Sequence, residues 1–141
     1  MDKQKLKVLF LVLLPIFAVG IACNPGSVLI FEPATEKGTT CSYFALLPEG
    51  TFRISTVLAG FLGCLAGGLS ITYAVGKKDA VAKGAMYASL ASAVLAVIPV
   101  LMRGEIMVLP NVGVPILLGV HAAVAYFMTA RKEKNEARRL K

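Results

Sequence analysis

The chain has 141 residues, of which 57% are hydrophobic and 16% are charged, and its formal net charge is +7. Ordinary soluble domains contain roughly a quarter charged residues, so this composition excludes a soluble globular domain and a disordered chain. The basic residues lie beside apolar segments, with little of the polar and aromatic surface that contacts bases, which argues against nucleic-acid binding.

Four apolar runs are long enough to cross a bilayer and predict membrane helices at 6–23, 52–75, 84–102 and 112–130. Between and after them we expect an outer loop at 24–50, an inner connector at 76–83, an outer connector at 103–111 and a basic tail at 131–141. The chain is therefore predicted to be an all-α integral membrane protein, a single membrane domain over 1–141 built as a four-transmembrane-helix bundle. In architecture alone it resembles small tetraspan proteins, and no motif assigns it to a family.

The first apolar run follows a basic start and also fits a removable signal peptide. We interpret it as a retained membrane helix, with a kink at Pro15 because proline removes a backbone hydrogen bond. In the outer loop, the pieces SVLIFEP and CSYFALLP are separated by the turn-like ATEKGTT. This pattern predicts a hairpin lying on the membrane surface.

Basic residues are distributed unequally along the chain. Twelve lie near the N-terminus, in the inner connector or in the tail, whereas only Lys37, Arg53 and Arg103 lie in or beside the two outer segments. Lysine and arginine favour the cytoplasmic side of a membrane. Both termini are therefore predicted to face the cytoplasm, or the matrix or stroma of an organelle, with the longer first loop on the opposite side.

Helices two, three and four each gather small residues on one side. Small residues let backbones approach closely, and lipid supplies no hydrophobic drive between helices, so we expect these faces to form a tight three-helix core with helix one at its edge. An oligomer contact through the Gly-x-x-x-Gly pattern of helix two is the alternative. The expected packing residues are Ala59, Gly63, Gly67, Ser70, Ala88, Ser92, Gly119 and Ala123.

His121 is the only histidine and lies in the fourth apolar run, where an ionisable group is by default a functional candidate. Helical geometry turns it about 200° from Gly119, away from the small-residue face. The side that it shares carries Val114, Leu118, Ala125 and Met128. That side could meet another subunit, or His121 could ligate the metal of a haem or chlorophyll. The third alternative is a neutral imidazole hydrogen-bonded to Ser, Thr or Tyr of another helix.

Two cysteines flank the outer loop on the same predicted side. Cys23 and Cys41 could form a disulfide in an oxidising compartment or remain free thiols. Cys64 lies inside the second apolar run, where we interpret it as a small apolar residue.

Interfacial charges are the other candidate polar sites. Arg53 and Arg103 are expected to pair with Glu49 or Glu105 at the membrane interface, or to bind an anionic head group.

No carboxylate falls inside the four predicted membrane helices, which disfavours cation-coupled transport. The sequence also contains no catalytic triad, zinc cluster, phosphate loop or dinucleotide fingerprint. The leading hypothesis is a non-catalytic accessory, structural or assembly subunit of a larger membrane complex. Its partners would be the lipid bilayer and other membrane subunits or further copies of the chain, with no cofactor required. The alternatives are a small transporter, channel or lipid-binding protein, and a pigment-binding or haem-binding subunit that uses His121.

Overall fold

A computed structural model of the chain describes residues 2–32, 37–44, 52–103 and 109–140. Each of its four helices contains a segment long and apolar enough to cross a membrane. This confirms the prediction of four such helices. The elements in order are α1 (Lys3–Cys23), β1 (Val28–Glu32), β2 (Lys37–Cys41), α2 (Phe52–Gly76), α3 (Asp79–Arg103) and α4 (Leu109–Arg139).

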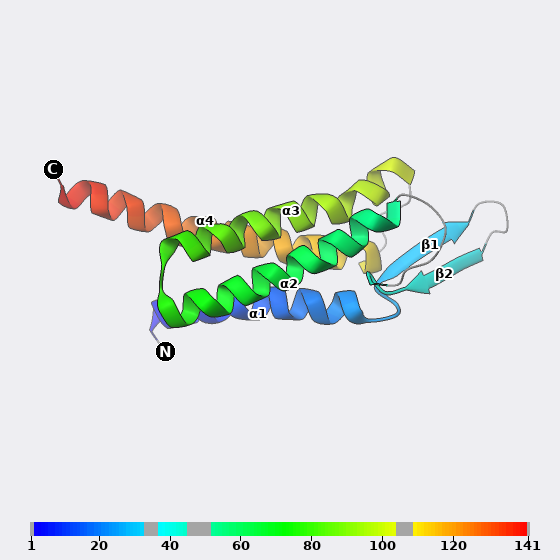
Figure 1. Ribbon diagram of the computed structural model, residues 1–141, viewed down its shortest axis with the longest axis horizontal. Helices are drawn as coiled ribbons and strands as arrows, with labels where there is room; N and C mark the ends of the chain where they lie inside the picture. The colour runs from blue at the N-terminus through cyan, green and yellow to red at the C-terminus, as the bar shows by residue number, and fades with distance from the viewer. Residues whose placement is uncertain (1, 33–36, 45–51, 104–108, 141) are drawn as a thin grey trace.

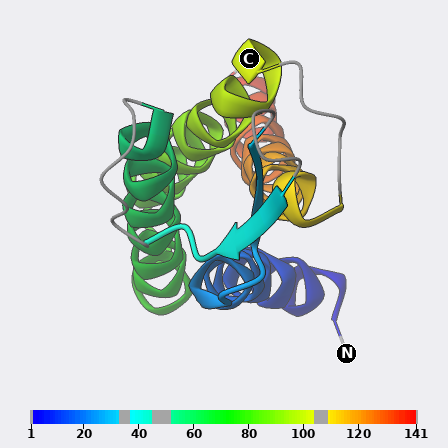
Figure 2. The ribbon, with the colours of Figure 1, turned by 90° about the vertical axis from the view of Figure 1, so that its right-hand side faces the viewer.

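The helices form a ring in which α1 packs against α2 and α4, and α3 packs against the same two helices (Figure 2). Both termini and the α2–α3 turn lie at one end of the bundle, the turn end, and the two strands lie at the other, the hairpin end (Figure 1). The expected three-helix core is therefore wrong, because α1 fills a full position in the ring between α2 and α4.

A two-residue turn connects α2 to α3. The helix α2 ends at Gly76, and Lys77 adopts a left-handed backbone conformation with a φ of 50°. Its N–H donates to the carbonyl oxygen of Tyr73 at 2.8 Å. The helix α3 begins at Asp79 rather than near residue 84, because the polar segment read as a connector contains good helix formers and places an acidic residue in the first turn.

The basic segment after the fourth apolar run continues α4 as a helix, and residues 131–139 are called the α4 extension. Two ion pairs join it to α3. The Nζ atom of Lys132 lies 2.9 Å from Oδ2 of Asp79, and the Nζ atom of Lys83 lies 2.5 Å from Oε1 of Glu133. Exposed pairs of this kind contribute little to stability, because solvent screens them. Their main effect is to set the direction in which the α4 extension faces.

The hairpin pairs Val28 with Cys41 in antiparallel register. Its second strand is KGTTC, not the predicted CSYFALLP, because the chain leaves the sheet after Cys41 and turns into the bundle. The N–H of Tyr43 donates to the carbonyl oxygen of Ala22 at 3.0 Å, and the Ser27 hydroxyl donates to the same oxygen at 3.2 Å. The carbonyl at the end of α1 thus holds both ends of the hairpin.

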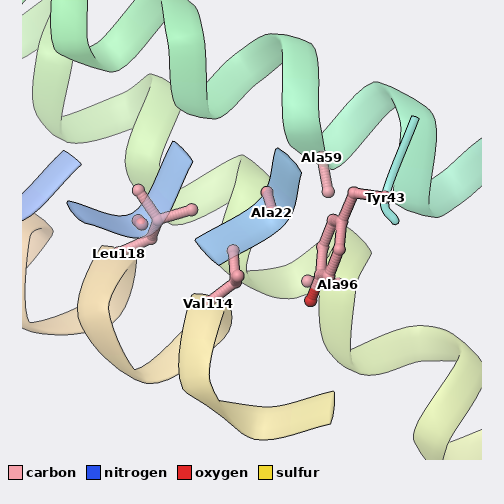
Figure 3. Packing of buried hydrophobic residues seen from close by; sticks show 7 residues of the cluster. Ala22, Tyr43, Ala59, Ala96, Val114 and Leu118 are labelled. Atoms are coloured by element: carbon pink, nitrogen blue, oxygen red, sulfur yellow. The ribbon is translucent and has the colours of Figure 1, made fainter. Parts of the chain in front are cut away.

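Tyr43 is the largest fully buried side chain of the described residues, and it closes the hairpin end of the bundle (Figure 3). Its neighbours are mostly alanines, whose small side chains leave room for the ring. Burial raises the pKa of Tyr43 to about 12. The group, called the Tyr43 cluster, comprises Ala18, Ala22, Tyr43, Ala59, Ala96, Val114 and Leu118.

Bulky apolar side chains surround the outside of the bundle on all four helices. Their exposure is compatible with a multi-pass membrane protein, since lipid tails can cover them. They include Phe10, Phe17, Phe61, Leu65, Tyr87, Leu90, Ile116 and Phe127.

Candidate functional site

His121 is fully buried and faces the interior of the bundle. The inward side of α4 also carries Val114, Leu118 and Ala125. The expected small-residue face of α4 is instead turned outward: Ala123 is exposed and Gly119 is half-buried, with nothing within 4 Å of a Cβ added there. This corrects the choice of face, because larger side chains of α4 fill the space that the small residues of α2 and α3 leave.

The small-residue faces of α2 and α3 both point into the bundle. A Cβ added at Gly63 would lie 3.6 Å from Leu118, 3.7 Å from Val19 and 3.8 Å from Ser92, so this glycine faces all three other helices. A Cβ at Gly67 would lie 3.8 Å from Pro15. The buried residues of the two faces are Ala59, Gly63, Ala66, Gly67 and Ser70 on α2, and Ala85, Ala88, Ser89, Ser92 and Ala96 on α3.

Both ring nitrogens of His121 meet a serine from another helix. Its Nε2 atom lies 2.9 Å from the hydroxyl oxygen of Ser70 on α2, and its Nδ1 atom is hydrogen-bonded to the hydroxyl of Ser89 on α3. Of the three alternatives for His121, the structure therefore has the hydrogen-bonded imidazole inside the bundle. We call His121, Ser70 and Ser89 the His121 cluster.

The hydrogen bonds of Ser70 are consistent with one neutral tautomer of His121. The Ser70 hydroxyl donates to the carbonyl oxygen of Ala66 at 2.7 Å. A hydroxyl has one proton, so when it donates to Ala66 it accepts from His121, and Nε2 of the ring is the donor. In a neutral imidazole Nδ1 is then the acceptor for Ser89. The chain of donors runs from Ser89 through His121 and Ser70 to the Ala66 carbonyl, and it needs no buried counter-charge.

A second polar contact joins α2 and α3 directly. The Ser92 hydroxyl donates to the carbonyl oxygen of Ala59 at 2.5 Å. The buried Thr129, in contrast, donates within its own helix, to Ala125 and Tyr126. The serines thus connect helices, whereas this threonine does not.

The three cysteines are free thiols in the structure, which is one of the two alternatives for Cys23 and Cys41. Cys64 is exposed on the outside of α2.

The expected interfacial pairs cannot be placed. Glu49 and Glu105 lie outside the described residues, as do the side chains of Arg53 and Arg103. Their pairing stays a prediction.

Sequence reasoning missed the role of Tyr43, whose only local signal is an aromatic residue close to the predicted helix ends. It also missed the ion pairs of Asp79 and Glu133. Opposite charges at the predicted start of α3 and end of α4 are a signal that could have found them, since adjacent antiparallel helices bring those ends together.

The chemistry that this arrangement supports is hydrogen bonding between helices. Within the ranges that the structure describes, no group of three or more His, Cys, Asp or Glu residues is placed to hold a metal ion. Comparison with protein-family models, with curated proteins and with solved structures finds no match.

Proposed function

We propose that this protein is a non-catalytic accessory, structural or assembly subunit of a larger membrane complex. The hydrogen bonds of His121 are the main support for this proposal. It is the only basic side chain among the buried residues that the structure describes, and both its ring nitrogens bond to serines of other helices. An intramembrane ionisable group is by default a functional candidate. Here its polar atoms join three helices, which supports a structural role for this residue rather than a catalytic one.

The outer surface offers support of a second kind. Large apolar side chains such as Phe17, Phe61 and Phe127 are each more than 60% exposed. In a membrane such side chains contact either lipid tails or the helices of a neighbouring subunit. A bundle whose interior is occupied by its own side chains would meet other subunits through this outer surface.

The proposed orientation places the turn end on the cytoplasmic, matrix or stromal side. Basic residues are concentrated there, and they favour that side. Labelling with a membrane-impermeant maleimide tests it in sealed vesicles from a background in which Cys23, Cys41 and Cys64 are replaced by alanine. A Lys134→Cys variant should label only after the inner side is made accessible, whereas restoring Cys23 should give labelling from outside. The reverse pattern would overturn the orientation.

Purification of the tagged full chain from its native membrane in mild detergent tests the function. We expect another membrane protein at a fixed stoichiometry, which should be missing from membranes carrying the untagged chain. A monodisperse homo-oligomer with no other subunit would contradict the accessory role and favour the second candidate.

The second candidate is a small transporter, channel or lipid-binding protein. The observation that favours it is the buried line of polar side chains formed by Ser92 and the His121 cluster, because intramembrane polar groups commonly mark pathways. Vesicles containing the purified protein and a pH-sensitive dye would show proton flux above empty vesicles, and His121→Ala should abolish it. Equal flux with and without the protein would exclude proton conduction as its function.

Haem or pigment ligation has less support, because it would require one of the two serine hydrogen bonds of His121 to break. A visible absorption band in the purified protein that disappears in His121→Ala would revive this alternative.

A further inference from the structure

The two ion pairs between α3 and the α4 extension fix which side of the extension faces α3. Lys132 and Glu133 are the members that reach α3, bonding Asp79 and Lys83. At 100° per residue the mean direction of these two side chains lies about 180° from a second set, Arg131, Lys134 and Arg138. The ion pairs therefore turn this second set away from α3.

Arg131, Lys134 and Arg138 are called the basic face. They lie within about 60° of one another around the helix and within about 10 Å along it. All three are exposed, and none forms an ion pair with another residue of the described ranges. Lys132, in contrast, is already paired. The α4 extension thus presents three cations together on one side.

The position of the basic face relates it to the membrane. It begins directly after the apolar run of α4, which ends at Ala130, and we take the hydrocarbon boundary to lie there. The headgroup layer on each side of a bilayer is roughly 5–7 Å thick, so Arg131 and Lys134 lie at its level, and the long side chain of Arg138 can reach back to it.

We propose that the basic face binds the phosphate groups of acidic phospholipids in the adjoining leaflet. Charge complementarity and depth favour lipid over an acidic protein, because the face starts at the hydrocarbon boundary rather than beyond the headgroups. Arginine and lysine both donate several hydrogen bonds to phosphate oxygens. The α3–α4 ion pairs act as the positioning element of this site. The proposal does not depend on the accessory role.

Native mass spectrometry of the full chain in detergent tests the proposal, with phosphatidylglycerol and phosphatidylcholine of identical acyl chains as probes. Each cation near an anionic surface contributes roughly fivefold in affinity. Combined Arg131→Gln, Lys134→Gln and Arg138→Gln should lower phosphatidylglycerol binding by on the order of 100-fold and leave phosphatidylcholine binding unchanged.

The matched control removes the same charge from α1 at the same end of the bundle, through Lys3→Gln, Lys5→Gln and Lys7→Gln, which are also exposed positions. It should retain most of the phosphatidylglycerol binding. Equal losses in both variants would overturn the proposal, since binding would then follow net charge alone. Equal binding of the two lipids by the unmodified chain would overturn it too. So would a combined basic-face variant that keeps phosphatidylglycerol binding but loses a co-purifying protein. Circular dichroism confirms that each variant keeps its helices.

Discussion

The Tyr43 cluster and the His121 cluster fill the interior of the bundle with different kinds of side chain. In both, a large ring fills space beside small residues of α2 and α3. Tyr43 enters from a loop and is surrounded by apolar carbon, whereas His121 comes from a helix and has a hydrogen-bond partner at each nitrogen. A ring in apolar surroundings is stabilised by contact area alone. A polar ring inside a membrane protein also needs a hydrogen-bond partner for each buried donor and acceptor.

The two clusters also differ in the helices that they join. Members of the Tyr43 cluster come from all four helices, because the ring lies between them at the hairpin end (Figure 3). The His121 cluster joins α2, α3 and α4, and the imidazole also meets the backbone of Leu11 on α1. Leu118 of the Tyr43 cluster and His121 are both on the inward side of α4, three residues apart. The two clusters thus form one continuous interior, and substitutions can separate their contributions.

The largest effect is expected from removing the Tyr43 ring. Tyr43→Ala should lower the free energy of unfolding by about 3–5 kcal/mol, because it deletes a fully buried aromatic ring and leaves a cavity. Tyr43→Phe keeps the volume and should cost less than about 1.5 kcal/mol. Unfolding in mixed micelles by increasing SDS measures both. Equal losses in the two variants would mean that the ring itself contributes little.

The next effect comes from Gly63, which faces the three other helices between the clusters. Gly63→Leu should cost about 1–3 kcal/mol, because the added carbons meet close neighbours on every side. Gly63→Ala should be nearly neutral, since its Cβ would be in ordinary contact at 3.6 Å or more. The control is Gly68→Leu, where nothing lies within 4 Å of an added Cβ. Thermal unfolding in detergent should separate Gly63→Leu from the other two, and no difference between the leucine variants would contradict this packing.

Smaller losses are expected from the serines of the His121 cluster. Ser70→Ala and Ser89→Ala should each cost about 0.6–1.7 kcal/mol, the range of interhelical hydrogen bonds in membranes. Thr129→Val is the control, because this hydroxyl donates only to carbonyls of its own helix, and its effect should be near zero. The double serine variant should cost a different amount from the sum of the single variants, since both act on one ring. Strict additivity would show that the ring does not couple them.

The sequence was sufficient to predict the four helices, because long apolar runs separated by charge have few other stable structures in water or lipid. The inward faces of α2 and α3 were also predictable from the spacing of Ala59, Gly63 and Ser70 and their counterparts. The same criterion chose the wrong face of α4. A bundle with small residues on two helices needs larger side chains opposite them, and a rule that looks for small residues on every helix misses Leu118 and His121.

The candidate site was only half predictable. The helical position of His121 correctly separated it from Gly119 and Ala123, yet which of the two sides faces inward depends on neighbours that one helix does not specify. The serine partners lie 32 and 51 residues away along the chain. Tyr43 and the early second strand depend on tertiary contacts at the end of α1, where the Ala22 carbonyl accepts from the N–H of Tyr43 just after that strand.

The last prediction concerns the pH dependence of the free energy of unfolding. Tyr43 should not change it near neutrality. Burial raises the pKa of Tyr43 to about 12, whereas the pKa of an exposed tyrosine is about 10. The folded chain therefore keeps this phenol neutral where the unfolded chain ionises it. The associated stability is fully present below about pH 10 and is lost as the pH rises through about 12.

Comparing the unmodified chain with Tyr43→Phe isolates this effect, since all other groups titrate in both. The free energy of unfolding should fall more steeply between about pH 10 and 12 in the unmodified chain, with phenolate absorbance appearing as it unfolds. Parallel curves would show that Tyr43 is accessible to solvent in the folded protein. The His121 cluster provides the contrast, because none of its members is a phenol. Adding Ser89→Ala to the unmodified chain and to Tyr43→Phe should therefore lower the free energy of unfolding by the same amount at every pH in this range.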